Sequence, residues 1–335
     1  MNKNILLVGG AGYIGTAITQ DFLKKNYKIK CIDALIYSQQ YCTKFFLKNK
    51  NYKFILGDIR DNKKNKDLFD GITDVVILAG LVGDPITKKY PKESESINYI
   101  ALKNFIDKCK NKKIEKVIFV STCSNYGLIN KDEVANEDHI LNPLSSYAKH
   151  KVAIENYLMS LKGQVDYSPT ILRFATAFGI SPRMRFDLTV NEFTRELYLK
   201  NNILVYDPNT WRPYCHVKDF AGLIDKIINS ESKKINFEIF NAGSDSNNST
   251  KLGIVKKLKK YFPESTIDFK DKGKDPRNYR VDFSKVKNIL NFETKFSIDD
   301  GIKEIAEALK KGKFKYEDEY SDNLGNYKIN NEFVI

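Results

Sequence analysis

The sequence has few of the residues that build disulfide frameworks or metal centres. Its five cysteines are odd in number, widely spaced and never arranged as CxxC, and none of its three histidines are four residues apart. A disulfide scaffold needs paired cysteines, and a zinc site needs closely spaced cysteine or histidine ligands. The sequence therefore predicts neither a disulfide framework nor a bound metal.

Long hydrophobic runs are also missing. The longest uninterrupted apolar stretch is Val75–Ala79, far short of the roughly 20 residues that cross a membrane. The apolar start of the chain is interrupted at Gly9-Gly10-Ala11-Gly12 and no cleavage-type sequence follows, which argues against a secretion signal. The composition, 42% hydrophobic and 29% charged, is that of a folded globular protein rather than a disordered one. We expect a cytoplasmic protein without membrane contact.

Arginine is scarce although the net charge is +13, because only 8 of the 55 basic residues are arginine. The lysines occur in nearly every segment, which favours a solvated surface over a nucleic-acid-binding face. Seven of the eight arginines follow residue 172, and arginine is the better residue where a planar group grips phosphate oxygens. The second half of the chain is therefore expected to bind an anion, and no nucleic acid is expected as a partner.

Short β-branched runs alternate with amphipathic stretches over the first 175 residues. The predicted strands are Asn4–Val8, Lys28–Ile32, Tyr52–Leu56, Asp74–Leu78, Lys116–Val120 and Thr170–Phe174. The predicted helices between them are Gly12–Lys25, Ser96–Lys110 and Ser145–Leu161. This alternation indicates an α/β fold with a Rossmann-type, doubly wound parallel sheet. Ligands of such sheets bind beyond the carboxyl ends of the strands.

After Gly179 the pattern is less regular and indicates a smaller C-terminal α/β lobe. We predict a sheet domain over residues 1–180, which a returning segment near 215–243 rejoins, and an interleaved ligand-binding lobe over 181–335. The helices predicted here are Leu188–Leu199, Val217–Asn229, Thr250–Tyr261, Ser284–Leu290 and Ile298–Lys310, and the strands are Ile203–Tyr206, Phe237–Phe240 and Thr266–Phe269. The tail after Gly312 has no readable pattern.

A glycine-rich turn, Gly9-Gly10-Ala11-Gly12-Tyr13-Ile14-Gly15, follows the first predicted strand and opens a helix. Gly9 permits a tight turn, Gly12 lets the backbone approach a pyrophosphate, and Gly15 allows close helix packing. The helix N-terminus supplies amide donors for the phosphates. Its position at the first strand-to-helix junction favours dinucleotide binding over a plain glycine turn.

Further candidate cofactor contacts follow the next three predicted strands. Asp33 ends the second strand, where a carboxylate binds a ribose diol and repels a 2′-phosphate, so NAD is favoured over NADP. Asp58 and Ile59 follow the third strand and are placed to contact the adenine. Ala79 and Gly80 follow the fourth, where small residues let a dinucleotide cross the sheet.

Tyr147 and Lys151 are four residues apart and therefore share one face of a predicted helix. An ammonium beside a phenol lowers its pKa, which would make Tyr147 an acid and base near neutral pH. The spacing alone is weak evidence, because Tyr99/Lys103 and Tyr214/Lys218 share it. The first pair differs in context: a helix start precedes it, and Ser121-Thr122 places hydroxyls at the end of the fifth strand.

Together these motifs resemble the extended short-chain dehydrogenase/reductase family, and within it the NAD-dependent nucleotide-sugar epimerases and dehydratases. The residues that carry the resemblance are Gly9–Gly15, Ala79-Gly80, Asn98, Ser121–Gly127, Tyr147/Lys151 and Trp211-Arg212-Pro213. The resemblance implies Thr122 as the hydroxyl that shares a proton with the sugar and Tyr147 as the base. It implies that Lys151 holds the nicotinamide ribose, and it adds Tyr13, Ile14 and Asn98 to the cofactor contacts.

The resemblance also bears on reaction type. In the sugar 4,6-dehydratases an Asp and a Glu follow the catalytic Thr, but here Cys123 and Ser124 occupy those positions, so dehydration by that route is disfavoured. We interpret Cys123 as a packing residue. What remains is redox chemistry at one carbon, most naturally C4 of the sugar.

The same resemblance implies a binding site for the substrate's diphosphate. Arg212 matches the arginine that grips this group, and a second basic residue is expected among Lys272, Arg277 and Arg280. Ala175 is expected to line the sugar pocket and Asn191 to contact the sugar nucleotide. Arg183 and Arg185 lie in a segment that resembles a sub-branch acting on bacterial surface sugars, including GDP-heptose, but a solvated linker explains them equally well.

The predicted function is NAD-dependent redox at C4 of a nucleoside-diphosphate sugar, and 4-epimerisation through a 4-keto intermediate is favoured narrowly. A 4-dehydrogenase or 4-ketoreductase uses the same residues and stays open. A non-catalytic NAD-binding regulator and an RNA-binding protein are the alternatives from other classes. By resemblance, a homodimer through helices 96–110 and 145–161 is also expected, with candidate contacts at Ile97, Ile100, Ala101, Phe105, Ile154, Tyr157 and Leu158.

Overall fold

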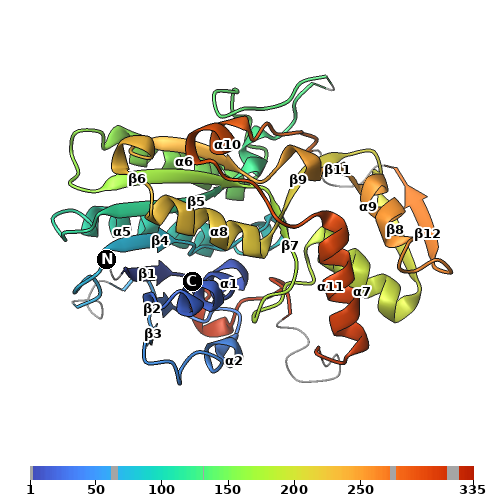
Figure 1. The fold of residues 1–335 in the computed structure, drawn as a ribbon, viewed down its shortest axis with the longest axis horizontal. Helices are drawn as coiled ribbons and strands as arrows, with labels where there is room; N and C mark the ends of the chain where they lie inside the picture. Colours follow the sequence, from blue (N-terminus) through green and yellow to red (C-terminus); the bar gives the residue numbers. More distant parts are fainter. Residues whose placement is uncertain (1–2, 62–66, 131, 272–276, 315–323) are drawn as a thin grey trace.

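A seven-stranded parallel sheet forms the centre of the protein, as the computed structural model of residues 3–61, 67–130, 132–271, 277–314 and 324–335 describes it (Figure 1). Its strands are β1 (Asn4–Val8), β2 (Lys28–Asp33), β3 (Tyr52–Leu56), β4 (Asp74–Ile77), β5 (Lys116–Thr122), β6 (Ser168–Phe174) and β10 (Glu238–Ala242). The strand order is β10-β6-β5-β4-β1-β2-β3, so the order reverses beside β1. This confirms the predicted Rossmann-type, doubly wound sheet, whose ligand crevice lies at such a reversal.

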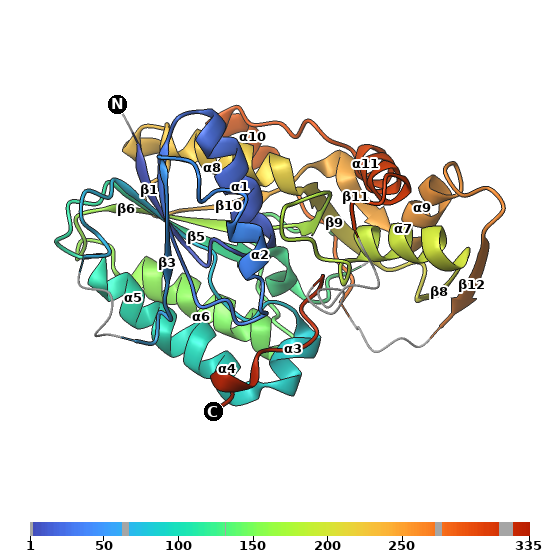
Figure 2. The same cartoon turned by 90° about the horizontal axis from the view of Figure 1, so that it is seen from below.

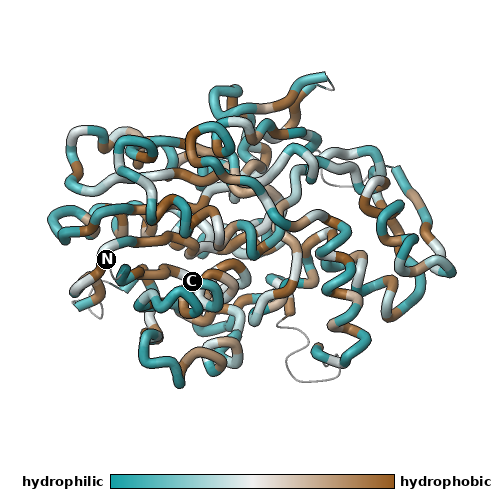
Figure 3. Tube along the Cα trace, viewed as in Figure 1, coloured by the Kyte–Doolittle hydropathy of each residue, from teal (hydrophilic) through white to brown (hydrophobic). Residues whose placement is uncertain are grey.

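Helices cover both faces of this sheet (Figure 2). One face carries α1 (Tyr13–Lys24), α8 (Val217–Ile228) and α10 (Ser284–Leu290), and the other carries α5 (Leu102–Lys108), α6 (Ser146–Ser160) and a π-helical segment, Ser96–Ala101. Three short helices, α2 (Gln40–Thr43), α3 (Asp84–Lys89) and α4 (Pro91–Glu95), lie in the connections. Most of these strands need no polar face because both of their faces are buried, which explains their continuous apolar runs (Figure 3). The edge strand β3 is partly exposed.

In the part of the chain that the structure describes, the lobe contains short strands and three helices. Its sheets contain β7 (Thr176–Phe178), β9 (Trp211–His216) and β11 (Asn248–Thr250) in one, and β8 (Asn202–Tyr206) and β12 (Thr266–Lys270) in the other. Its helices are α7 (Thr189–Lys200), α9 (Lys251–Leu258) and α11 (Ile298–Lys310). A separate apolar core that includes Phe178, Tyr214 and Ile302 joins them.

The predicted strands and long helices agree with the observed ones, whereas the short helices α2, α3 and α4 and the strands β7, β9 and β11 were not predicted. These strands are short, and the Trp-Arg-Pro-Tyr-Cys-His sequence of β9 has no β-branched residue, so it carries little strand signal. The segment after β9 returns to the main sheet, where β10 pairs with β6. The boundary of the two domains at residue 180 stays a prediction.

Several candidate dimer contacts are buried inside the chain's own core. Ile97, Ala101, Phe105, Ile154 and Leu158 pack between the sheet and its helices. They are therefore unavailable to a second copy, and their proposed contact role is wrong. Ile100 remains 50% exposed, and Tyr157 is partly exposed.

All five cysteines are free and buried. The thiol of Cys123 contacts the carbonyl of Arg173, 3.1 Å away, which confirms Cys123 as a packing residue. Within the described residues, no group of three or more His, Cys, Asp or Glu side chains could hold a metal ion. No helix in these residues is long and apolar enough to span a membrane.

Candidate active site

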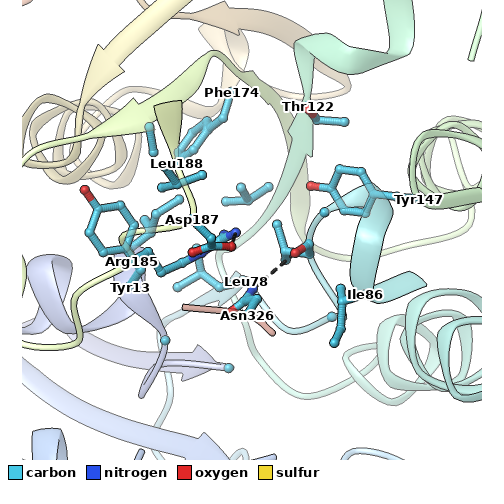
Figure 4. A pocket seen from close by; sticks show the side chains of 18 of the residues that line it. Tyr13, Leu78, Ile86, Thr122, Tyr147, Phe174, Arg185, Asp187, Leu188 and Asn326 are labelled. Carbon is cyan, nitrogen blue, oxygen red and sulfur yellow. Dashed lines mark hydrogen bonds and ion pairs between the residues drawn. The ribbon is translucent and has the colours of Figure 1, made fainter. Parts of the chain in front are cut away.

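A cavity of about 730 Å³ lies at the carboxyl ends of the central strands, between the sheet and the lobe. Its walls contain the glycine turn and Asp33 at one end and Thr122, Tyr147 and Arg212 at the other. The cavity is therefore continuous between the predicted cofactor contacts and the predicted catalytic residues. Figure 4 shows the part of it around Tyr147.

The glycine turn at the start of α1 is tightly packed. Gly9 has a positive φ of +79°, and a Cβ on Gly9 would lie 2.6 Å from the backbone of Ala79. A Cβ on Gly15 would lie 2.5 Å from the carbonyl oxygen of Gly10, so Gly15 packs on the turn itself. Gly12 caps α1 without a side-chain hydrogen bond and borders the cavity, where the helix N-terminus favours a phosphate group.

Asp33 is held rigidly at the end of β2. Its carboxylate accepts hydrogen bonds from the backbone N–H groups of Ala11 (3.0 Å) and Leu35 (2.8 Å) and from Gln39 (3.3 Å). Burial raises its pKa, and the two backbone donors oppose this rise. A fixed carboxylate at the cavity wall fits the ribose diol of NAD.

All but one of the predicted cofactor contacts line the cavity: Gly9, Gly12, Tyr13, Ile14, Gly15, Asp33, Asp58, Ile59, Ala79, Gly80, Tyr147 and Lys151. Asn98 does not. Its side chain accepts a hydrogen bond from the N–H of Leu81 (2.7 Å) and donates one to its carbonyl (2.9 Å). Asn98 therefore supports the loop after β4 from behind rather than facing a ligand.

Tyr147 lies in the first turn of α6. Ser145 caps this helix by accepting a hydrogen bond from the N–H of Ala148 (3.2 Å), which confirms the predicted helix start. Thr122 ends β5, and its hydroxyl accepts a hydrogen bond from the N–H of Ser124 (3.1 Å). Thr122, Tyr147 and Lys151 thus meet at one wall of the cavity.

The pKa of Tyr147 is raised in the cofactor-free protein, against the predicted lowering beside Lys151. Burial raises the pKa of Tyr147, and the groups that oppose this rise are Arg185, Arg277 and a hydrogen bond with Thr122. Burial also lowers the pKa of Lys151 to about 7, while the charge of Glu155 opposes this. The Lys151 ammonium donates to the carbonyl of Val120 at 2.6 Å and lies 6.0 Å from the centre of the Tyr147 ring.

A buried ion pair secures the catalytic wall from behind. Glu155, one turn after Lys151, pairs with Arg173 of β6 at 2.8 Å. Glu155 also accepts hydrogen bonds from Ser121 and from Asn125 (2.7 Å). The end of β5 is therefore joined to both α6 and β6, which fixes the position of Thr122.

The diphosphate end contains Arg212 and Arg277. The Arg212 guanidinium lies 5.1 Å from the centre of the Tyr279 ring and donates to the carbonyls of Trp211 and Arg277. Arg277 donates to the Ser124 hydroxyl (3.2 Å). Arg212, Arg277 and Ala175 all line the cavity, as predicted for substrate contacts.

Two other predicted substrate contacts lie outside the cavity lining. Asn191 is fully buried, accepts a hydrogen bond from Gly179 (3.0 Å), and donates to Tyr13 (3.1 Å) and Arg185 (2.9 Å). It joins the lobe to the glycine turn. Arg280 instead lies over the Trp211 ring, at 5.4 Å. Lys272 is outside the described residues.

Arg183 and Arg185 are buried and line the cavity, so the solvated linker is the wrong reading of this segment. Arg185 makes a two-pronged ion pair with Asp187, at 2.6 and 3.0 Å. Arg183 lies over the Tyr37 ring at 5.1 Å, near Asp33. These two arginines, which belong to the half of the chain expected to bind an anion, therefore line the cavity on the side of the lobe.

Some cavity residues were not predicted. Asp84, Asp187, Asn326 and Tyr327 line the cavity, and Asp84 is 3.5 Å from Arg277. Asp187 lies in the segment of Arg183 and Arg185, which the sequence analysis had singled out, so its position could have been predicted. The sequence of the tail that contains Asn326 and Tyr327 gave no such indication.

Curated relatives cover nearly the whole chain. The protein is 30% identical over 323 residues to an uncharacterised protein of Methanocaldococcus jannaschii, a match that covers 90% of this chain and 94% of the relative. It is 25% identical to the UDP-glucuronate 4-epimerase of Thermodesulfobacterium geofontis, over 89% of this chain and 93% of that one.

Solved structures show the same fold. The UDP-glucose 4-epimerase of Thermotoga maritima, solved with UDP-glucose, superposes with a TM-score of 0.82 at 25% identity, over 93% of this chain and 100% of that chain. The UDP-glucuronic acid 4-epimerase of Bacillus cereus, solved with UDP-glucuronic acid and NAD, gives a TM-score of 0.82 at 24% identity, over 92% of this chain and 99% of that chain.

A sequence model of the NAD dependent epimerase/dehydratase family matches residues 5–243, which contain the glycine turn, Asp33, Thr122, Tyr147, Lys151 and Arg212. The cavity has the glycine turn, the fixed carboxylate and the helix N-terminus that NAD requires. The protein belongs to the NAD-dependent epimerase/dehydratase family of enzymes.

Proposed function

We propose that the protein catalyses redox at C4 of a nucleoside-diphosphate sugar, and that the reaction is 4-epimerisation through a 4-keto intermediate. The observation that carries this proposal is the meeting of Thr122, Tyr147 and Lys151 at one wall of a cavity whose other end fits NAD. The 4-epimerases among the similar proteins support the choice of reaction. A role in surface polysaccharide synthesis is part of this proposal.

Tyr147 is the proposed acid and base. Its phenol faces the cavity beside Thr122, so it is placed to take the proton of a sugar hydroxyl and to return it. Bound NAD would supply the carbon that accepts the hydride from C4 and returns it. Thr122 would donate a hydrogen bond to the oxygen on which charge develops, and Arg185 and Arg277 offset the charge of a phenolate.

Arg212 and Arg277 are the proposed diphosphate contacts. Both line the cavity beyond the catalytic wall, and guanidinium groups bind phosphate oxygens through paired hydrogen bonds. Asp84 forms an ion pair with Arg277, and Asp187 forms one with Arg185. We therefore assign these two carboxylates to positioning the arginines. No carboxylate stands at positions 123 and 124, which favours epimerisation over dehydration.

The substrate and the fate of the hydride can be tested together. The purified protein with NAD is offered UDP-, GDP-, CDP- and dTDP-sugars, while product mass and the absorbance of reduced nicotinamide are followed. A product of unchanged mass with no net reduction of NAD is expected for the epimerase. Accumulating reduced cofactor would instead indicate a 4-dehydrogenase, and no reaction with any sugar would contradict the proposal.

We predict that Tyr147→Phe lowers turnover by about 10²–10⁴-fold, because the general acid and base is lost. NAD affinity should stay within about twofold of the wild type, because the ring remains. Tyr99→Phe is the matched control, since Tyr99 shares the YxxxK spacing but lies outside the cavity lining. Near-normal turnover of Tyr147→Phe would remove Tyr147 from its proposed role.

A further inference from the structure

The last described segment, residues 324–335, crosses from the lobe to the sheet domain, and we refer to it as the C-terminal strap. On the lobe side the carbonyl of Leu324 accepts a hydrogen bond from the N–H of Phe186 (2.6 Å). The carbonyl of Gly325 accepts one from Arg183 (3.0 Å). The strap therefore begins on the arginine-containing wall of the cavity.

The other end of the strap is fixed to the sheet domain. Ile329 is 1% exposed and belongs to the apolar core that also contains residues of β1 and β4. The N–H of Asn330 donates to Ile36 (2.8 Å), and the N–H of Ile335 donates to Glu93 (2.8 Å). Figure 2 shows this red segment passing along α3 and ending beside α4. The strap thus bridges the two halves of the protein beside the cavity.

Asn326 is the strap residue that faces the cavity from a buried position. It is 8% exposed, and its side-chain N–H donates to the carbonyl of Val82 (3.1 Å). Its backbone N–H lowers the pKa of Asp187 by donating to that carboxylate. Figure 4 shows Asn326 between Asp187 and Arg185 on one side and Ile86 on the other.

The side-chain oxygen of Asn326 has no hydrogen-bond partner among the described residues. A buried acceptor without a partner costs about 1–3 kcal/mol, so native proteins rarely leave one unsatisfied. The amide is not free to turn this oxygen elsewhere, because its N–H group is held by Val82. Because Asn326 lines the cavity, this buried oxygen is suited to a donor on a ligand that binds there.

We propose that Asn326 is a ligand-binding residue that accepts a hydrogen bond from a ring hydroxyl of a bound ribose or sugar. The loop after β4, which holds its N–H group, also lines the cavity, whose walls contain both the cofactor contacts and the catalytic residues. The donor is therefore a hydroxyl of the NAD ribose or of the sugar nucleotide. NAD is the cofactor of the family, whereas binding of a sugar nucleotide rests on the proposed function.

The test compares Asn326→Ala with Lys328→Ala, an exposed residue of the same strap. NAD⁺ binding to the cofactor-free proteins is measured by calorimetry. Binding of the sugar nucleotide that reacts in the panel is measured on the NAD-loaded proteins. Because one net hydrogen bond contributes about 1 kcal/mol, Asn326→Ala should weaken the binding of one of the two ligands by about fivefold. Lys328→Ala should change neither.

A second measurement separates ligand contact from a merely structural effect. Hydrogen exchange of the wild-type amides at residues 324–330 should slow when the affected ligand is added. Affinities of Asn326→Ala within about twofold of the wild type for both ligands would overturn the proposal, and so would an unchanged exchange rate. If no sugar nucleotide binds the wild type, the proposed function fails, and the NAD⁺ measurements alone then decide the role of Asn326.

Discussion

Lys151 shows how strongly burial governs single residues in this cavity. Lys151 is 2% exposed and its pKa is lowered to about 7, which its spacing from Tyr147 in the sequence does not reveal. The unfolded chain therefore holds a proton that the folded protein releases above this pH. Stability that depends on Lys151 should accordingly rise as the pH increases from about 7 towards the ordinary pKa of lysine, and it should be constant below about pH 7, where both states hold the proton.

We predict that the free energy of unfolding of the cofactor-free wild type, relative to that of Lys151→Met, rises between about pH 7.5 and about pH 8.5. The rise is limited to about 1.4 kcal/mol per pH unit, the value for one proton. Urea unfolding of both proteins at the two pH values measures it. A parallel pH dependence of the two proteins would show that Lys151 keeps its ordinary pKa.

The site residues that could be identified from the sequence lie at the ends of predicted strands or in recognisable motifs. Asp33 follows a strand, and Thr122 follows another, so the position of each beside the cavity follows from the topology of the sheet. The raised pKa of Tyr147 depends on burial by elements distant in sequence, which spacing does not reveal. Asn326 reaches the cavity only because the tail folds back over the site, and no local pattern in the tail indicates this.

At the scale of the elements, the junction of β1 and α1 is the most constrained part of the cofactor end. Gly15 allows α1 to start directly against the glycine turn, with no room for a Cβ beside Gly10. A side chain there would displace backbone rather than a flexible side chain. The turn and the helix N-terminus would both move.

We predict that Gly15→Ala weakens NAD⁺ binding by at least about tenfold and destabilises the protein by about 1–3 kcal/mol, the usual cost of overpacking. Gly222→Ala in α8 is the matched control, because a Cβ there meets only Phe292, at 4.0 Å. The control should keep wild-type NAD⁺ affinity, and calorimetry with thermal unfolding measures both effects. Equal NAD⁺ affinities of Gly15→Ala and the wild type would contradict the role given to the turn.

Element prediction succeeded where apolar runs are continuous and failed where they are short. Most strands of the first half are buried on both faces, although the edge strand β3 is partly exposed, so their sequences carry a strong signal. By contrast, β7 pairs with β9 and extends the lobe with only three residues. Such a strand is specified by its partner rather than by its own sequence.

At the scale of the whole molecule, the proposed dimer remains a prediction. The apolar surface available for a dimer is smaller than the sequence indicated, because most apolar residues of helices 96–110 and 145–161 pack in the core of the same chain. Ile100 is the exposed apolar residue on this face, together with parts of Tyr99 and Tyr157. Tyr99 also stacks on His150, which joins the two helices on their outer surface.

We predict that the wild type has the mass of a dimer in light scattering at micromolar concentration and that Ile100→Asp has the mass of a monomer, because a charge there would be buried without a partner. Ile140→Asp is the matched control, since Ile140 is 85% exposed and belongs to neither helix. A monomeric wild type, or an unchanged mass of Ile100→Asp, would contradict the proposed face.

The central claim, hydride transfer at C4 of a nucleotide sugar, is tested most directly with substrates that carry deuterium at C4. Product from the protein with NAD is analysed by mass spectrometry and NMR. The account predicts that the C4 epimer forms with its deuterium still at C4, because the same hydride is removed and returned. Loss of the deuterium to solvent, or its retention in an unreacted sugar for every nucleotide tested, would contradict the account.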